Sequence, residues 1–159
     1  RSHRSQLDFD LELARTASPE NPVYYIQYAH ARIKSVFRRA KEEGIQCGPT
    51  SAKLSLLDLP EEVALAKIAD RYPSVIATAA LQLEPHHVAF YLLELARAFQ
   101  GYYSKGKRDD RYRILSEEHA RTEAKLYLLK SIGIVLQNGL RLLGISAPDE
   151  MEGKETVDA

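Results

Sequence analysis

Apolar residues recur at intervals of three and four along most of this chain. The clearest run follows Pro85 and consists of Val88, Tyr91, Leu92, Leu95, Ala96 and Phe99. A second run follows Ser116 and consists of Ala120, Ala124, Leu128, Ile132, Val135, Leu136, Gly139 and Leu143. This spacing puts side chains on one face of an α-helix. It therefore predicts helices from Pro85 to about 103 and from Ser116, as N-cap, to Gly144.

Turn and capping residues mark the other predicted helices. Asn21 as N-cap and Pro22 at the first position begin a helix that runs to about residue 43, where Gly44 ends it. A second begins at Asp58, which is able to cap, with Glu61 reaching back, and ends near residue 72. The alanine-rich stretch 74–83 is also assigned to a helix rather than a strand. The fold class predicted is all-α, a helical bundle.

The predicted domain organisation is a single helical domain, residues 22–148, between two less regular ends. Residues 1–21 form a lead-in, in which 5–14 alternates apolar and acidic residues and suits either a short strand or an extended segment. Residues 149–159 form an acidic tail that we expect to be frayed. The polar, basic stretch 104–113 has no apolar period and is predicted to be a loop.

Length and composition exclude several classes of protein. The 159 residues fit one domain, and 45% hydrophobic with 28% charged residues is typical of a globular chain. No apolar run is long enough to span a membrane, and no secretory signal precedes the first helix. Cys47 is the only cysteine, which indicates a reducing compartment. The chain starts at Arg1, and its only methionine is Met151, so we expect a segment of a larger parent protein.

The formal net charge of zero conceals an uneven distribution. Residues 30–41 carry five basic residues and no acid, and residues 97–113 carry six basic residues against two acids. The end of the chain, 147–159, carries five acids against one lysine. Cationic clusters beside tyrosines suit an anionic partner with stackable rings, because cations attract phosphates and bases stack on aromatic side chains.

The first predicted helix separates into two faces at 100° per residue. Its core face consists of Ile26, Ala29, Ile33, Phe37 and Ala40. A second stripe outside that face consists of Tyr25, Tyr28, Arg32 and Arg39. Such a stripe suits the binding of nucleic-acid bases. The alternative is a solvated basic face with tyrosines at the edge of the core, and the pattern alone favours that alternative.

Motifs for catalysis or metal binding are absent. The chain has no Gly-x-x-x-x-Gly-Lys loop, no Gly-x-Gly-x-x-Gly turn and no Gly-x-Ser-x-Gly turn. His86 and His87 are neighbours on a helix, so their rings are expected to diverge and not to share a metal ion. We therefore predict no catalytic residue, no metal site and no cofactor in this segment.

Four blocks of sequence resemble one family in the same order. Residues 21–32, Asn-Pro-Val-Tyr-Tyr-Ile-Gln-Tyr-Ala-His-Ala-Arg, resemble the opening of the anticodon-binding domain of arginyl-tRNA synthetases. Residues 7–11 resemble the segment that leaves the catalytic core of these enzymes, and 95–103 their Leu-Ala-x-x-Phe-x-x-aromatic-Tyr helix. Residues 137–148, followed by Met151, resemble their C-terminal signature. The family's fold is a helical bundle of the DALR type, although that tetrapeptide is absent here.

The resemblance implies that the chain recognises the anticodon loop of an arginine tRNA. The family positions that enclose the middle anticodon base, a cytosine, fall on Tyr25, Arg32, Tyr103 and Met151. Together with the stripe and the basic clusters, this gives two sets of expected contacts. The anticodon-binding set is Tyr25, Tyr28, Arg32, Arg39, Tyr102, Tyr103 and Met151. The set that contacts phosphates is Lys105, Lys107 and Arg108.

The resemblance also implies partners and a parent reaction. The expected partners are arginine tRNA and the catalytic domain of the parent chain, with no membrane and no DNA. The parent is expected to be a cytoplasmic class I arginine–tRNA ligase that uses ATP with magnesium, chemistry that this segment cannot perform alone. The alternative from another functional class is a helical protein-interaction domain without an RNA-specific role.

Overall fold

The computed structural model describes residues 16, 18, 20–45 and 52–151. Its helices are α2 (Pro22–Glu42), α3 (Pro60–Asp70), α4 (Tyr72–Gln82), α5 (His86–Lys105) and α6 (His119–Leu142), with short 3-10 turns at Leu54–Leu56 and Asp110–Tyr112. Over this part of the chain no strand forms, so the all-α prediction is confirmed. None of these helices is long and apolar enough to cross a membrane. The predicted strand or extended segment at 5–14 lies outside the described residues.

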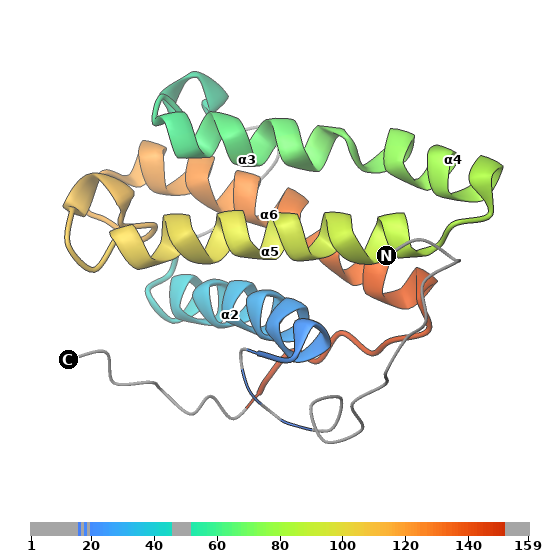
Figure 1. Ribbon diagram of the computed structural model, residues 1–159. Coiled ribbons are helices and arrows are strands. Elements are labelled where there is room, and N and C mark those ends of the chain that lie inside the picture. Colours follow the sequence, from blue (N-terminus) through green and yellow to red (C-terminus); the bar gives the residue numbers. More distant parts are fainter. Residues whose placement is uncertain (1–15, 17, 19, 46–51, 152–159) are drawn as a thin grey trace.

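The helices lie in three layers. α5 and α6 contact each other and form the middle, α2 packs against both of them on one side, and α3 and α4 cover the other side end to end (Figure 1). The predicted α5 stripe is entirely buried, as are four of the five residues predicted for the core face of α2. A Cβ at Gly139 would lie 2.5 Å from Leu92 Cδ2, so this glycine allows α6 and α5 to approach closely.

The helix ends agree with the sequence in some places and differ in others. The Asn21 side chain accepts a hydrogen bond from Val23 N at 3.0 Å, so the predicted cap of α2 is confirmed. Gly44, with φ of +71°, follows the end of α2, as predicted. Residues 74–82 are helical, within α4, and Leu83 ends that helix in the left-handed region. The loop 104–113 contains only the 3-10 turn beyond the last turn of α5.

The predicted caps of the second and last helices are wrong. Leu59 is the N-cap of α3, and Glu62, not Glu61, accepts a hydrogen bond from its backbone nitrogen. Asp58 instead pairs with Arg121 of α6 at 2.8 Å. α6 begins at His119, later than predicted, because residue 116 hydrogen-bonds to the Thr122 hydroxyl instead of capping the helix.

Candidate nucleic-acid interface

Arg32 lies at the centre of the surface where α2 meets α5. Its guanidinium carbon is 4.5 Å from the centre of the Tyr28 ring and 4.8 Å from that of Tyr103, so two aromatic rings contact it. One guanidinium nitrogen donates to the Tyr28 hydroxyl at 2.7 Å, and the other donates to the side-chain oxygen of Gln100. These partners are all neutral, so they orient the guanidinium and leave its positive charge uncompensated.

The aromatic and cationic surface extends in both directions from Arg32. Tyr24 and Tyr28, one turn apart on α2, have nearly parallel rings with centroids 6.1 Å apart. At the other end, Arg39 donates a hydrogen bond to the Tyr103 hydroxyl at 3.2 Å. We call this set, Tyr24, Tyr28, Arg32, Arg39 and Tyr103, the aromatic–arginine surface. Flat rings and a planar cation in one row form a platform on which bases can stack.

The structure thus brings together four of the residues predicted to bind the anticodon: Tyr28, Arg32, Arg39 and Tyr103. Tyr25 is half-buried against the hydrophobic core, beside this surface. Sequence reasoning missed Tyr24 and Gln100. Tyr24 has a detectable signal, since it precedes Tyr28 by four residues. Gln100 has none of its own, because its role depends on how α5 packs against α2.

The prediction that Tyr102 contacts the anticodon is wrong. Only 1% of this residue is exposed, and its hydroxyl donates a hydrogen bond to Glu62 of α3 at 2.9 Å. Burial, with the neighbouring Glu62 carboxylate, raises the pKa of the Tyr102 phenol well above its usual range. Adjacent helix positions point about 100° apart, so Tyr102 faces α3 whereas Tyr103 faces α2.

The cations predicted to contact phosphates differ in their surroundings. Lys105 forms an ion pair with Glu61, and this hydrogen bond raises the pKa of the lysine and lowers that of the glutamate. Lys107 and Arg108 are exposed, and neither forms an ion pair within the part of the chain that is described. The positive charge of Lys105 is therefore already matched, and that of Lys107 and Arg108 is available to a phosphate.

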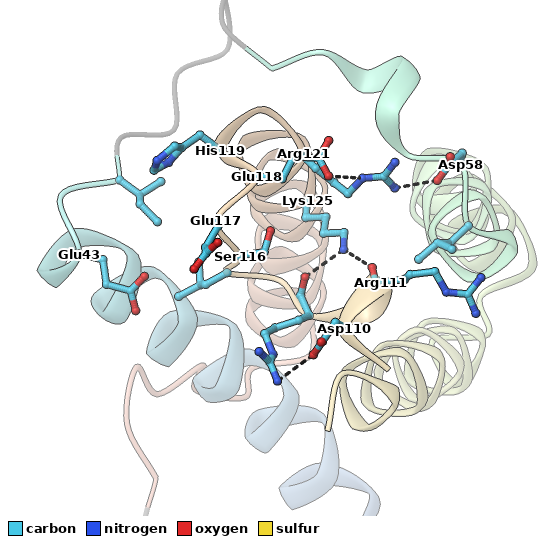
Figure 2. A pocket seen from close by; sticks show the side chains of 14 residues that line it. Glu43, Asp58, Asp110, Arg111, Ser116, Glu117, Glu118, His119, Arg121 and Lys125 are labelled. Atoms are coloured by element: carbon cyan, nitrogen blue, oxygen red, sulfur yellow. Dashed lines mark hydrogen bonds and ion pairs between the residues drawn. The ribbon is translucent and has the colours of Figure 1, made fainter. Parts of the chain in front are cut away.

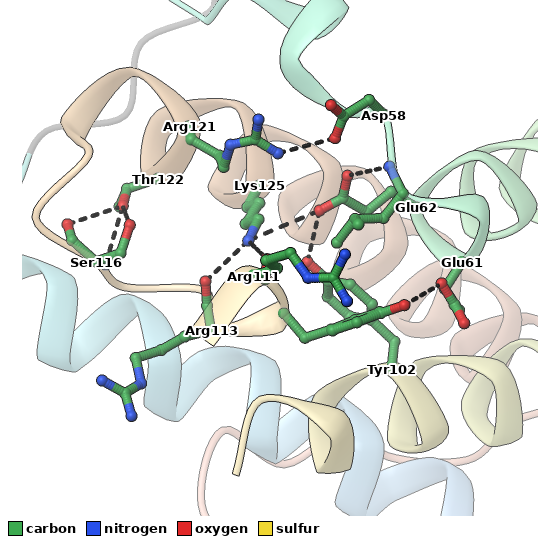
Figure 3. A network of polar contacts seen from close by, with 12 residues as sticks. Asp58, Glu61, Glu62, Tyr102, Arg111, Arg113, Ser116, Arg121, Thr122 and Lys125 are labelled. Carbon is green, nitrogen blue, oxygen red and sulfur yellow. Dashed lines mark hydrogen bonds and ion pairs between the residues drawn. The ribbon is translucent and has the colours of Figure 1, made fainter. Parts of the chain in front are cut away.

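A buried polar network fixes the loop that carries these cations (Figure 3). Lys125 of α6 is 1% exposed; its ammonium donates to the backbone oxygens of Arg111 and Arg113 and lies 3.8 Å from Glu62. Burial lowers the pKa of Lys125, and the Glu62 carboxylate opposes that shift. Glu62 also accepts hydrogen bonds from Leu59 N and from the Tyr102 hydroxyl. The network therefore ties residues 111–113 to both α3 and α6.

An open pocket of about 1120 Å³ lies beside this network, where the loop meets the start of α6 (Figure 2). Its lining contains both signs of charge. Arg121 pairs with Asp58 at 2.8 Å and with Glu118 at 3.3 Å, and Arg113 pairs with Asp110 at 2.9 Å. These cations are already matched by acids, so the pocket lacks the excess positive charge that a phosphate site requires.

The segment after α6 returns along α2 (Figure 1). Gln27 donates to Ser146 O at 2.8 Å, and His30 Nδ1 lies 2.9 Å from Pro148 O. Further along, Asp149 pairs with Lys34 at 3.1 Å and Glu150 lies 3.4 Å from Arg38. These contacts lead to half-buried Met151. Two of the five cations in the first basic cluster are therefore paired with the start of the acidic tail.

The prediction that the rings of His86 and His87 diverge is also wrong. Their centroids lie 4.5 Å apart at an angle of 30°, and both rings lie close to the Glu84 carboxylate. The first turn of α5 follows a tight connection in which Leu83 has a positive φ of 56°. That connection places Glu84 beside both imidazoles, an arrangement that helix geometry alone does not show.

Comparison with known proteins identifies the family. The model of the DALR anticodon binding domain matches residues 26–151. This chain belongs to that family. It is 48% identical, over 92% of its length, to the arginine–tRNA ligase of Citrifermentans bemidjiense, and 49% identical, over 91%, to that of Acidithiobacillus ferrooxidans. The matched regions are 26% and 24% of those proteins, so the chain spans about a quarter of the length of these relatives.

A solved structure agrees with the family assignment. The arginyl-tRNA synthetase of Thermus thermophilus superposes with a TM-score of 0.77 and is 34% identical. The match covers 92% of this chain and 24% of that one. The predicted family resemblance is thus confirmed, and so is the helical fold that it implies.

Proposed function

We propose that this chain is the anticodon-binding part of an arginine–tRNA ligase and that its aromatic–arginine surface receives bases of the anticodon loop. The observation that carries the proposal is the position of Arg32. Its guanidinium contacts two tyrosine rings and a buried amide, and no carboxylate pairs with it among the described residues. A partly buried planar cation held beside aromatic rings can stack against an unstacked base and donate hydrogen bonds to it.

Each part of the surface has a distinct role in the proposal. Tyr28 and Tyr103 stack with splayed bases, and Arg32 donates hydrogen bonds to acceptors on the Watson–Crick edge of one base. A cytosine, the expected middle base, offers such acceptors. The proposal also assigns Tyr25 and Met151 to the enclosure of that base, as the resemblance to the family implies. Lys107 and Arg108 contact phosphates, which fix the position of the loop without reading its sequence.

The reaction of the parent protein lies outside this segment. We propose that the rest of the parent chain holds the catalytic domain, which attaches arginine to its tRNA with ATP and magnesium in the cytoplasm. The segment itself contributes affinity and the choice of tRNA. The chain contains no glycine-rich phosphate loop, so we expect no ATP–pyrophosphate exchange by the 159-residue chain, with or without arginine.

The test measures binding of the 159-residue chain to two RNA hairpins by fluorescence anisotropy. One hairpin carries the anticodon stem-loop of an arginine tRNA, and the other has a single change at the middle anticodon base. We expect tighter binding to the first and a dissociation constant that rises steeply with salt. Tyr103→Ala is expected to weaken that binding by about 1–3 kcal/mol, roughly 5- to 150-fold, because one base stack is lost.

Arg32→Lys keeps the charge and removes the planar fork, so it is expected to lose most of the discrimination between the two hairpins. Lys67→Ala on α3 is the matched control, since this exposed lysine lies in the layer opposite α2 and should leave binding unchanged. If folded Arg32→Lys discriminates like the unaltered chain, Arg32 does not read the base. Binding without salt dependence, or to a protein and not to RNA, would support the protein-interaction alternative.

A further inference from the structure

A cluster of three metal-ligating side chains lies at the corner between α4 and α5. Glu84 is in the connection, and His86 and His87 begin α5. One ligand atom from each of the three residues lies within 4.8 Å of the other two. We propose that this cluster binds one divalent transition-metal ion, with Zn²⁺ as the representative ion. This site is independent of RNA binding.

Two of the three distances between ligand atoms are close to those of a tetrahedral ion. Zinc binds imidazole nitrogen and carboxylate oxygen at about 2.0–2.2 Å, so two ligands in a tetrahedral site lie roughly 3.3 Å apart. Here His87 Nε2 is 2.8 Å and His86 Nε2 is 3.8 Å from Glu84 Oε2. These two distances bracket the required value. The three side chains are between 31% and 39% exposed, so small rotations can equalise the distances.

The chemistry of the donors selects the class of ion. Two imidazoles and a carboxylate form a nitrogen-rich set that suits zinc and its neighbours in the first transition row. Calcium and magnesium prefer oxygen ligands only. On binding, His87 releases its hydrogen bond to Glu84, and the neutral ring carries its proton on Nδ1. Water completes the coordination, because only three protein ligands are present.

The position of the cluster limits the affinity and defines the effect of the metal. The N-terminus of α5 carries a partial positive charge that disfavours a bound cation, and the negative charge of the Glu84 carboxylate offsets this effect. A bound ion would join the α4–α5 connection to the first turn of α5. That connection contains Leu83 in the left-handed region, which is costly for a residue with a side chain. We therefore expect zinc to stabilise this corner.

The cluster also lies far from Tyr103, the α5 residue of the aromatic–arginine surface. His87 and Tyr103 are 16 residues apart on one continuous helix, about 24 Å at 1.5 Å per residue. Zinc at the corner should therefore leave the affinity for the anticodon hairpin unchanged. Failure of the metal proposal and failure of the RNA proposal are thus separate results.

The experiment is a calorimetric titration of the metal-free 159-residue chain with Zn²⁺. We expect one ion per chain and a higher melting temperature in the presence of zinc. His87→Ala and Glu84→Gln should each weaken zinc binding by at least about tenfold and remove that thermal shift. Both side chains are about a third exposed, so both variants should fold. Co²⁺ in place of zinc should give the intense visible absorption of a tetrahedral site, and His87→Ala should lose it.

Two control variants remove donors located elsewhere. His119→Ala changes an exposed histidine at the start of α6, and Cys47→Ser removes the only thiol of the chain. Both should bind zinc like the unaltered protein. The proposal is overturned by an absence of zinc binding at micromolar concentrations. It is equally overturned if His87→Ala and Glu84→Gln bind as tightly as the unaltered chain, or if a control variant loses the site.

Discussion

Replacing Lys125 with methionine tests whether the buried network holds the structure together. Methionine nearly matches the length of the lysine stem but has no ammonium. The change removes the donor to two loop carbonyls and the cation beside Glu62, which is fully buried. Among the described residues, Glu62 would retain the hydrogen bonds from Leu59 N and Tyr102 and the more distant attraction of Arg121. A buried carboxylate without its adjacent cation would then remain in the interior.

The expected cost follows from that burial. Breaking a buried ion pair by removing one partner costs about 3–5 kcal/mol, because the remaining charge stays desolvated. For a domain of this size, each kcal/mol lowers the melting temperature by roughly 2–4 °C. Lys125→Met should therefore lower it by about 6–20 °C. Since Lys125 also holds the loop that carries Lys107 and Arg108, hydrogen exchange in that loop should accelerate.

Denaturant unfolding followed by circular dichroism measures the change in the free energy of unfolding. The matched second variant combines Lys125→Met with Glu62→Gln, which removes the stranded charge and leaves an amide oxygen for the Tyr102 hydroxyl. The double variant should be at least about 1 kcal/mol more stable than Lys125→Met alone. The reasoning is refuted if the single variant loses less than about 1 kcal/mol, or if the two substitutions are simply additive.

Three further predictions concern other positions. Gln100→Leu removes the amide that orients Arg32. Discrimination between the two RNA hairpins should fall severalfold, whereas the melting temperature should change little. A variant that discriminates like the unaltered chain would contradict this role. Gly139→Ala should cost about 1–3 kcal/mol in denaturant unfolding, because the added Cβ would overlap Leu92. Burial raises the pKa of Tyr91 to about 12, so the folded state keeps a proton that the unfolded state loses above about pH 10. Stability should fall by about 2 kcal/mol as pH rises from 10 to 12, and Tyr91→Phe should remove that share of the loss.

The sequence predicts the helices well because their signals are local. The spacing of apolar residues and the positions of proline and glycine predict the extent of α2, α4 and α5 closely, since each of these signals acts within one or two helical turns. The capping residues of α3 depend on other helices instead. Glu61 and Glu62 are adjacent carboxylates that could both reach back, and Glu61 turns away because Lys105 of α5 and Tyr112 bind it. No pattern within 58–62 contains that information.

The same distinction explains the candidate site. Tyr28 and Arg32 are one turn apart, so their contact is visible in the spacing. Tyr102 and Tyr103 follow Phe99 by three and four residues, and both positions are compatible with its apolar stripe. Only the packing of α5 between α2 and α3 decides that Tyr102 enters the core and Tyr103 faces Arg32. The helix around Tyr102 is therefore predicted correctly, and the position of its side chain is not, because that position depends on tertiary packing.

The distribution of acids decides which cations can act on an RNA. Lys34 and Arg38 carry charge in the first basic cluster, but Asp149 and Glu150 return along α2 and pair with them. Their interaction with a phosphate would first require those pairs to break. Arg32 is held by neutral groups, and none of the acids that the structure describes pairs with it. The structure therefore places one cation that is held by neutral groups among the aromatic rings, and selectivity for a base should depend more on Arg32 than on the larger number of cations around it.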